Sequence, residues 1–148
     1  MSYLALKLTR YGPPESSLQL VECEEETPSL EEAIVHVDAV GMHIADSLTA
    51  RGIEKLKEAP CIPGFEGVGT VKSLGSKVKE LKEGDKVLLP MGTGAMTQQI
   101  RLPSSILTRV PQQYAFRQHQ HERLPLPNPE FLPRTQPVAA NFLGGHNE

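Results

Sequence analysis

Apolar and polar residues alternate with a period of two in several short segments of this chain. The alternation runs through residues 3–8 and 18–23, and a third segment, residues 32–40, is rich in β-branched side chains. This spacing places apolar side chains on one face of an extended chain, so each segment predicts a β-strand. The prolines at 13 and 14 lie between the first two segments, and we expect a hairpin-like turn there.

A helical pattern is confined to one short stretch, residues 43–52. Ile44 and Leu48 are four positions apart, which places both on one face of a helix, and we expect that face to be apolar. Gly52 is suited to end the helix in a left-handed conformation. Residues 53–59 are charged, and their pattern fits either a continued helix or a loop.

The second half of the body repeats the strand pattern, with glycine and proline turns between the segments. The predicted strands there are residues 68–74, 86–89, 96–102 and 106–110. Many short strands with little helix indicate a mainly β fold, and we expect a partly open β-barrel with one or two short helices over residues 1–111.

Composition changes after Pro111. Residues 112–148 contain five prolines, five glutamines, one valine and no isoleucine. This Pro/Gln-rich segment lacks the periodic apolar content that a packed element needs, so it predicts an irregular, disordered tail.

Charge and cysteine content narrow the functional classes. The formal net charge of −3 over 148 residues leaves no basic excess for phosphate backbones, which argues against a nucleic-acid partner. The apolar run at the N-terminus is short and is broken by Lys7, so it predicts neither a signal peptide nor a membrane span. Cys23 and Cys61 are far apart and fit a reducing compartment. We expect a cytoplasmic protein, with a mitochondrial address left open.

The most specific motif lies between residues 60 and 87. It reads Pro60-Cys-Ile-Pro-Gly-Phe-Glu-Gly-Val-Gly-Thr-Val, then Gly75-Ser-Lys-Val and Lys82-Glu-Gly-Asp-Lys-Val. This segment resembles the GroES-like, substrate-side domain of medium-chain dehydrogenases and reductases. The co-chaperonins share that barrel architecture but not this motif. The resemblance implies a chain truncated before the nucleotide-binding domain and inactive by itself.

The resemblance also indicates whether this chain carries the zinc ligands of related enzymes. Zinc-dependent alcohol dehydrogenases carry Gly-x-Cys-His-x-Asp where this chain reads Gly41 to Asp46, and the ligand cysteine is replaced by His43. Their Gly-His-Glu, which holds the second ligand, reads Gly64-Phe65-Glu66 here. Their group of four structural-zinc cysteines has no counterpart between residues 85 and 98. The resemblance therefore implies the zinc-independent branch and no metal site.

Within that branch, the chain is similar to quinone oxidoreductases and trans-2-enoyl-CoA reductases at Gly92-Thr-Gly-Ala-Met-Thr-Gln-Gln. Met96 stands where those relatives carry a tryptophan, and the proton-donor tyrosine of the enoyl reductases is absent between residues 50 and 60. The resemblance implies hydride transfer from NADPH to a quinone, enone or enoyl thioester. The Gly92 segment lacks the three glycines and following helix of a dinucleotide fingerprint, so we expect NADPH not to be bound by this chain alone.

Five residues are candidates for the site. The resemblance implies that His43, Met91 and Thr93 line the cleft, the last two on the cofactor side. Asp46 and Glu66 are the carboxylates suited to a proton relay and, with His43, are the candidates for catalysis. Each has a structural alternative: His43 as a helix-start histidine, the two acids as anchors of backbone donors, and Met91 and Thr93 as turn or packing residues.

Two functions follow from these observations. The first is the substrate-side domain of a zinc-independent, NADPH-dependent oxidoreductase. The second is a non-catalytic binding or regulatory module that associates through its exposed barrel face, for example with a full-length relative. Redox turnover by the isolated chain and its state of association distinguish them.

Overall fold

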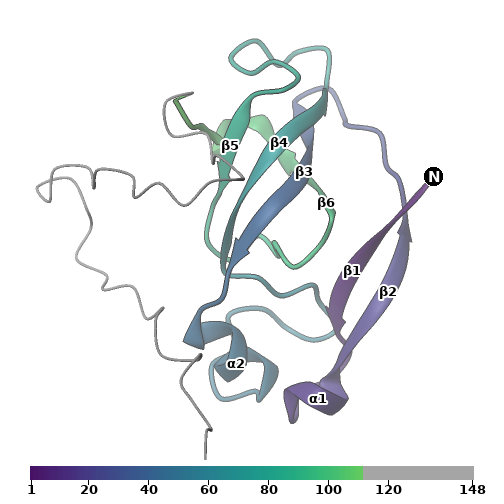
Figure 1. Cartoon of the computed structure of the whole chain (residues 1–148), viewed down its shortest axis with the longest axis vertical. Coiled ribbons are helices and arrows are strands. Elements are labelled where there is room, and N and C mark those ends of the chain that lie inside the picture. Colours follow the sequence, from purple (N-terminus) through teal and green to yellow (C-terminus); the bar gives the residue numbers. More distant parts are fainter. Residues whose placement is uncertain (112–148) are drawn as a thin grey trace, which may run out of the picture. The chain divides into compact units, whose positions relative to one another are not determined.

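The computed structural model of this chain describes residues 1–111, and the predicted tail at 112–148 lies outside the described residues. The described chain contains two sheets and two short α-helices, whose arrangement can be followed in Figure 1. The elements are β1 (Ser2–Leu8), α1 (Pro14–Ser17), β2 (Leu18–Glu24), β3 (Glu32–Gly41), α2 (Ile44–Ala50), β4 (Glu66–Leu74), β5 (Lys86–Leu89), β6 (Gln99–Pro103), the 3-10 turn η1 (Ser104–Ile106) and β7 (Thr108–Arg109).

The strands form a β1–β2 hairpin and a five-stranded sheet in the order β6-β3-β4-β5-β7, with antiparallel pairing throughout. The two edge strands of the larger sheet, β6 and β7, are not paired with each other within the described chain. An isolated bridge between Ala5 and Thr97 brings β1 beside the segment that enters β6. The prediction of a mainly β, partly open barrel is confirmed.

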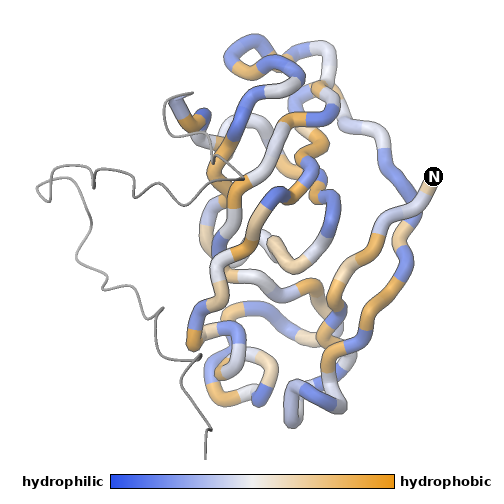
Figure 2. Tube along the Cα trace, in the orientation of Figure 1, coloured by the Kyte–Doolittle hydropathy of each residue, from blue (hydrophilic) through white to orange (hydrophobic). Residues whose placement is uncertain are grey.

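The core lies on the inner face of the five-stranded sheet. Val35, Val71 and Val87 come from three neighbouring strands and are at most 2% exposed. Each buried valine of this kind contributes about 1.5–3 kcal/mol through removal of apolar area from water. The hydropathy colouring in Figure 2 shows that the loop between β4 and β5, at the top of the view, is mostly hydrophilic. Burial on one face and polar turns explain the period-two pattern of the strand segments.

One glycine allows the two longest strands to approach closely. A Cβ atom on Gly69 of β4 would lie 2.4 Å from Val35 Cγ1 and 2.5 Å from the His36 carbonyl oxygen, both on β3. The pairing register of β3 shifts beside it, between Val37 and Ala39. Only a residue without a side chain fits this contact, so Gly69 permits the close approach of β3 and β4 beside the register shift.

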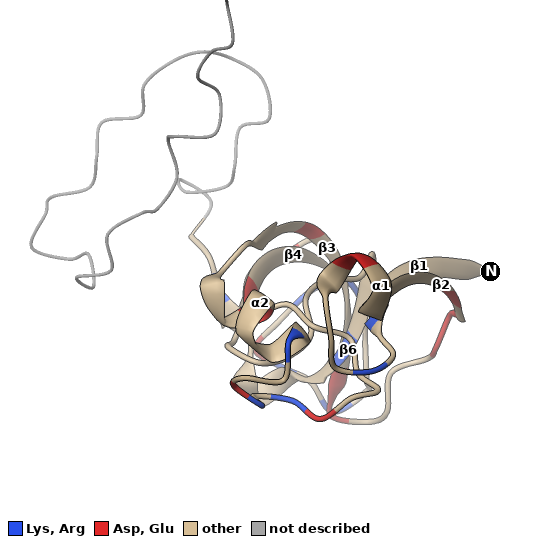
Figure 3. Cartoon of the chain, turned by 90° about the horizontal axis from the view of Figure 1, so that it is seen from below, with Lys and Arg blue, Asp and Glu red and all other residues tan. Residues whose placement is uncertain are grey.

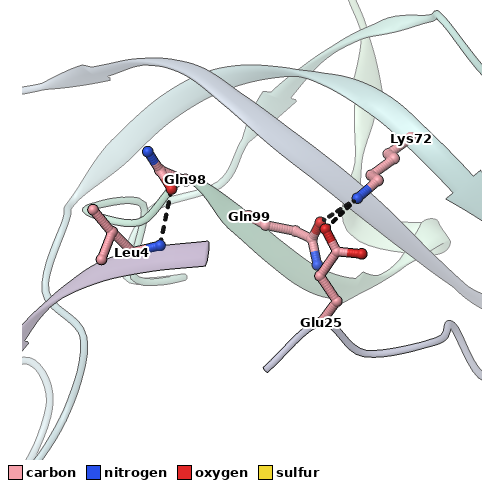
Figure 4. A network of polar contacts seen from close by, with 5 residues as sticks. All are labelled: Leu4, Glu25, Lys72, Gln98 and Gln99. Carbon is pink, nitrogen blue, oxygen red and sulfur yellow. Dashed lines mark hydrogen bonds and ion pairs between the residues drawn. The ribbon is translucent and has the colours of Figure 1, made fainter. Parts of the chain in front are cut away.

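Polar contacts join the hairpin to the sheet. Figure 4 shows Gln98 Oε1 accepting from the Leu4 amide at 2.9 Å, and Lys72 Nζ donating to Glu25 at 2.8 Å and to Gln99 at 3.1 Å. Figure 3 shows acidic and basic residues interspersed along the described chain. Within residues 1–111, no helix has the length and apolar content needed to cross a bilayer.

Three local predictions were wrong. In α2 the buried side chains are Ala45, Thr49 and Ala50, whereas Ile44 is 72% exposed. The predicted strand at 96–102 begins only at Gln99, because the residues before it bond to the hairpin and to residue 63. The predicted strand at 106–110 is reduced to β7, since η1 takes up its first residue. The charged residues 53–59 form an irregular loop with bends and no continued helix.

Candidate functional site

An open cavity of about 510 Å³ lies where three strands end near η1. Its walls come from the end of β3, the start of β4, the end of β5, and residues 106 and 108. They are mostly apolar, with Val40, Val68 and Leu89 among them, and Glu66 is the one charged residue in the lining. Of the predicted site residues, the structure brings Glu66 and Met91 together in this cavity. Its size and apolar lining suit a small uncharged organic molecule.

His43 stands at the start of α2, where it forms a reciprocal capping box. Its Nδ1 atom accepts a hydrogen bond from the Ala45 amide at 3.1 Å, and its own amide donates to Asp46 Oδ2 at 3.0 Å. Both contacts satisfy backbone donors that a helix leaves unpaired in its first turn. His43 is exposed and does not line the cavity.

Asp46 ties this helix to the segment that leads into β4. Its second oxygen, Oδ1, accepts from the buried Gly64 amide at 3.2 Å. Gly64 has a φ of +119°, and a Cβ atom there would lie 2.4 Å from the Met96 amide nitrogen. Asp46 therefore holds a backbone geometry that only glycine adopts readily, and this geometry places Phe65 beside α2. These contacts match the structural alternative for Asp46.

His43 and Phe65 stack on each other. Their ring centroids are 4.7 Å apart and the ring planes are inclined by 16°. The resemblance placed the two catalytic-zinc ligands at these chain positions, and the fold does bring the positions together. A phenyl ring offers no ligand atom, and His43 Nδ1 is already used as an acceptor. Among residues 1–111, no group of three or more His, Cys, Asp or Glu could hold a metal ion.

In the glycine-rich segment after β5, the backbone amides donate hydrogen bonds to carbonyls of neighbouring segments. The Gly92 amide donates to the Phe65 carbonyl at 2.9 Å, and the Met96 amide donates to the Pro63 carbonyl at 2.9 Å. The amides of Gly94 and Ala95 both donate to the Gly64 carbonyl, at 3.2 and 3.3 Å. A phosphate-binding loop presents such amides to its ligand, so this loop does not have that geometry. Its role is to fix the residues beside the stack.

Thr93 lies apart from Met91, at a second cavity of about 370 Å³ near β1. Its hydroxyl donates to the Pro90 carbonyl at 2.8 Å, and its own carbonyl accepts from Lys57 Nζ at 3.1 Å. Lys57 thereby joins the loop before Pro60 to the loop after β5, a role that sequence reasoning missed because no periodic pattern marks it. In the same cavity, burial raises the pKa of the Cys61 thiol, partly offset by the Lys57 charge.

Three large apolar side chains are exposed in the segments around the stack. Met42 is 83% exposed and Ile44 72%, on either side of His43, and Met91 is 70% exposed. Single exposed apolar residues are ordinary, but three in the segments that border one cavity mark a surface suited to contact with another molecule.

Comparison with known proteins agrees with the fold and with the motif. Residues 29–112 match the alcohol dehydrogenase GroES-like domain family. The quinone oxidoreductase-like protein 2 homolog of Nematostella vectensis is 34% identical over 121 residues, which cover 79% of this chain and 32% of that protein. The crystal structure of a Pseudomonas syringae pv. Tomato DC3000 quinone oxidoreductase matches with a TM-score of 0.63 and 29% identity, over 77% of this chain and 35% of that one.

A third match, the ETR1P/NADP/crotonyl-CoA complex, has a TM-score of 0.68 over 75% of this chain and 34% of that one. At 21% identity this likeness concerns the fold alone. The chain spans about a third of the length of the curated relative from Nematostella vectensis. The matched family, the barrel and the motif at residues 60–87 agree with one another. The chain therefore belongs to the alcohol dehydrogenase GroES-like domain family of the medium-chain dehydrogenases and reductases, an oxidoreductase family.

Proposed function

We propose that residues 1–111 form the substrate-side domain of a zinc-independent, NADPH-dependent oxidoreductase that reduces a quinone, an enone or an enoyl thioester by hydride transfer. The observation that carries this proposal is the His43–Phe65 stack, at the two positions where the zinc enzymes of this family carry ligands. An aromatic pair at those positions supports chemistry that needs no metal. The names of the matched quinone oxidoreductases support the substrate class.

The cavity beside the stack supports the same chemistry. Quinones and enones are flat and largely apolar, and the lining around Val68 and Leu89 is apolar as well. In nicotinamide-dependent reductions the cofactor supplies the hydride, while the protein binds and orients the substrate and excludes water. Residues 1–111 contribute the apolar wall, the exposed imidazole of His43 and the carboxylate of Glu66. Met91 belongs to the cavity wall. Thr93 stabilises the loop that carries Met91, because its hydroxyl donates to the Pro90 carbonyl.

We further propose that the reaction requires a nucleotide-binding domain in addition to residues 1–111. The amides of Gly92 and Gly94 donate to the carbonyls of residues 65 and 64, and the Thr93 amide donates to the Pro90 carbonyl, so these amides do not form a cradle for the pyrophosphate of NADPH. The segment after Gly64 continues as β4, whereas a dinucleotide fingerprint opens a helix. The barrel by itself therefore does not bind NADPH or turn over substrate. The two free cysteines suit a reducing compartment, and we propose the cytoplasm.

The test uses the purified chain and a fluorescence titration of NADPH. We expect no NADPH binding and no quinone-dependent NADPH oxidation by the chain alone. Oxidation should appear when a separately produced nucleotide-binding domain of a quinone oxidoreductase is added, and elemental analysis should show no stoichiometric zinc. Robust turnover by the chain alone, or one tightly bound zinc per chain, would contradict the proposal.

The exposed apolar side chains favour a second candidate function, a binding module that associates with a protein partner through this surface. Met42, Ile44 and Met91 are its most exposed members. Such a module carries no redox activity in any mixture. Light scattering coupled to size-exclusion chromatography tests association directly, with a Met42→Ser, Ile44→Ser double variant as the control. A wild-type chain that stays monomeric and binds no full-length relative would rule out this alternative.

A further inference from the structure

We propose that the Nε2–H group of His43 is the hydrogen-bond donor that recognises the carbonyl oxygen of a planar, uncharged substrate. This inference rests on the proposed function and adds a named atom and a ligand geometry to it. Three observations carry it: the hydrogen bond at Nδ1, the stack on Phe65, and the exposure of His43 together with its chain neighbours Met42 and Ile44.

The hydrogen bond at Nδ1 determines which ring nitrogen carries the proton. Because Nδ1 accepts from the Ala45 amide at 3.1 Å, it has no proton of its own. A neutral imidazole in this arrangement carries its proton on Nε2 and is a donor there. The two nitrogens lie at different positions of the ring, so with Nδ1 turned to the helix amide, Nε2 is directed away from it. Within residues 1–111, Nε2 has no hydrogen-bond partner.

The orientation of the ring is held from two sides. Phe65 packs against one face of the imidazole with an interplanar angle of 16°. Asp46 holds both chain segments that carry the two rings, since it accepts from the His43 amide and from the Gly64 amide. The donor is therefore fixed before any ligand arrives, and a prearranged donor loses little conformational entropy on binding.

The surroundings of the ring indicate the shape and charge of the ligand. His43 is exposed, and its chain neighbours Met42 and Ile44 are 83% and 72% exposed. An exposed imidazole in a segment with two exposed apolar side chains, stacked on one face by Phe65, suits a flat ring that places one oxygen at Nε2. Glu66, the one charge in the lining of the neighbouring cavity, disfavours an anionic ligand. The ligand class is a neutral aromatic or conjugated carbonyl compound.

A donor at this oxygen also suits the reduction. When a quinone or enone is reduced, negative charge builds up on its carbonyl oxygen, and a fixed N–H group stabilises that charge. His43 thus acts only as a hydrogen-bond donor: NADPH would supply the hydride and become NADP⁺, and the resulting oxyanion would take its proton from water. The relatives' proton-donor tyrosine, which this chain lacks, is not needed for this step.

Nitrogen NMR and ligand titration of the full chain test the inference. The probe is acetophenone, a planar ketone that does not react with thiols, and the matched ligand is ethylbenzene, which lacks the oxygen. His43→Asn keeps a side-chain oxygen that can cap α2, and His43→Phe keeps a ring that can stack on Phe65. Both variants lack the Nε2 donor.

In the wild-type chain, we expect the His43 nitrogen shifts of an Nε2–H tautomer and a change at Nε2 on addition of acetophenone. Acetophenone should bind about two- to tenfold more tightly than ethylbenzene, as expected for one net hydrogen bond, and both variants should lose this preference. A proton on Nδ1, or an unchanged preference in His43→Asn, would overturn the inference while leaving the proposed function intact. If neither ligand shifts any resonance around His43 and Glu66, the donor role and the substrate-side function are both refuted.

Discussion

Asp46 is the residue on which the geometry of the site depends most, and Asp46→Ala is the sharpest test of that view. The carboxylate satisfies two backbone donors from separate segments, the His43 amide at 3.0 Å and the Gly64 amide at 3.2 Å. Loss of a helix-capping side chain costs about 0.5–2 kcal/mol. The buried Gly64 amide, left without a partner, costs about 1–3 kcal/mol more. We therefore expect Asp46→Ala to lower the free energy of unfolding by about 2–4 kcal/mol, the middle of that combined range.

Urea denaturation followed by circular dichroism measures this difference. Asp46→Asn is the matched control, because its one oxygen can satisfy only one of the two amides, and we expect about half of the loss. NMR ring-current shifts of Phe65 report on the stack independently and should change in Asp46→Ala. A loss below about 0.5 kcal/mol, the range of ordinary surface substitutions, would refute the view that Asp46 organises the site.

Further expectations concern the sheet, a surface acid and a thiol. Gly69→Ala should destabilise the chain far more than Gly84→Ala in urea denaturation, because a Cβ at Gly69 meets atoms of β3 within 2.5 Å. At Gly84 no atom lies within 4 Å, and only the strain of its φ of +87°, about 1–2 kcal/mol, opposes alanine; equal losses would contradict the close-approach argument. The hydrogen bond from the Ser29 amide lowers the pKa of Glu32. The free energy of unfolding of the wild type should therefore exceed that of Glu32→Gln above the ordinary pKa of 4.5, and the difference should vanish as the pH falls through the lowered pKa. A difference that stays constant from about pH 3 to 7 would contradict this expectation. Burial raises the pKa of Cys61, so iodoacetamide should modify it more slowly in the folded than in the urea-unfolded chain, and mass spectrometry showing equal rates would count against this.

The sequence was sufficient for elements whose two faces differ in environment. In β3, Val35 is buried and Val37 is half-buried, while His36 and Asp38 are exposed, so the alternation in the sequence predicted a half-buried strand correctly. The pattern misled in α2, where Ile44 is exposed and Thr49 is buried. A helix of seven residues has too few positions for hydrophobicity to define its buried face, and the surroundings decide it.

In the candidate site, too, the sequence identified the residues but not their roles. The residues at 43, 46, 65 and 66 could be selected from the two segments that resemble the dehydrogenases and reductases, residues 41–46 and 60–87, but the role of each depends on its partners. Asp46 and Glu66 are both acids, yet the first is bonded to two backbone amides and the second lines the apolar cavity. Nothing in the sequence indicated the role of Lys57, because its partners are backbone carbonyls. One of them, the Thr93 carbonyl, is 36 positions away in the chain.

By itself, the sequence determined the mainly β character of residues 1–111, the place of the one helix longer than a single turn, and the family to which the barrel belongs. These properties follow from local alternation, from turn residues and from a contiguous motif. Only the tertiary structure decided that His43 stacks on Phe65 and that Thr93 and Met91 face different cavities. Those contacts join segments brought together by strand pairing and by close backbone approach, and such long-range neighbours are set by the packing of the whole barrel rather than by any local pattern.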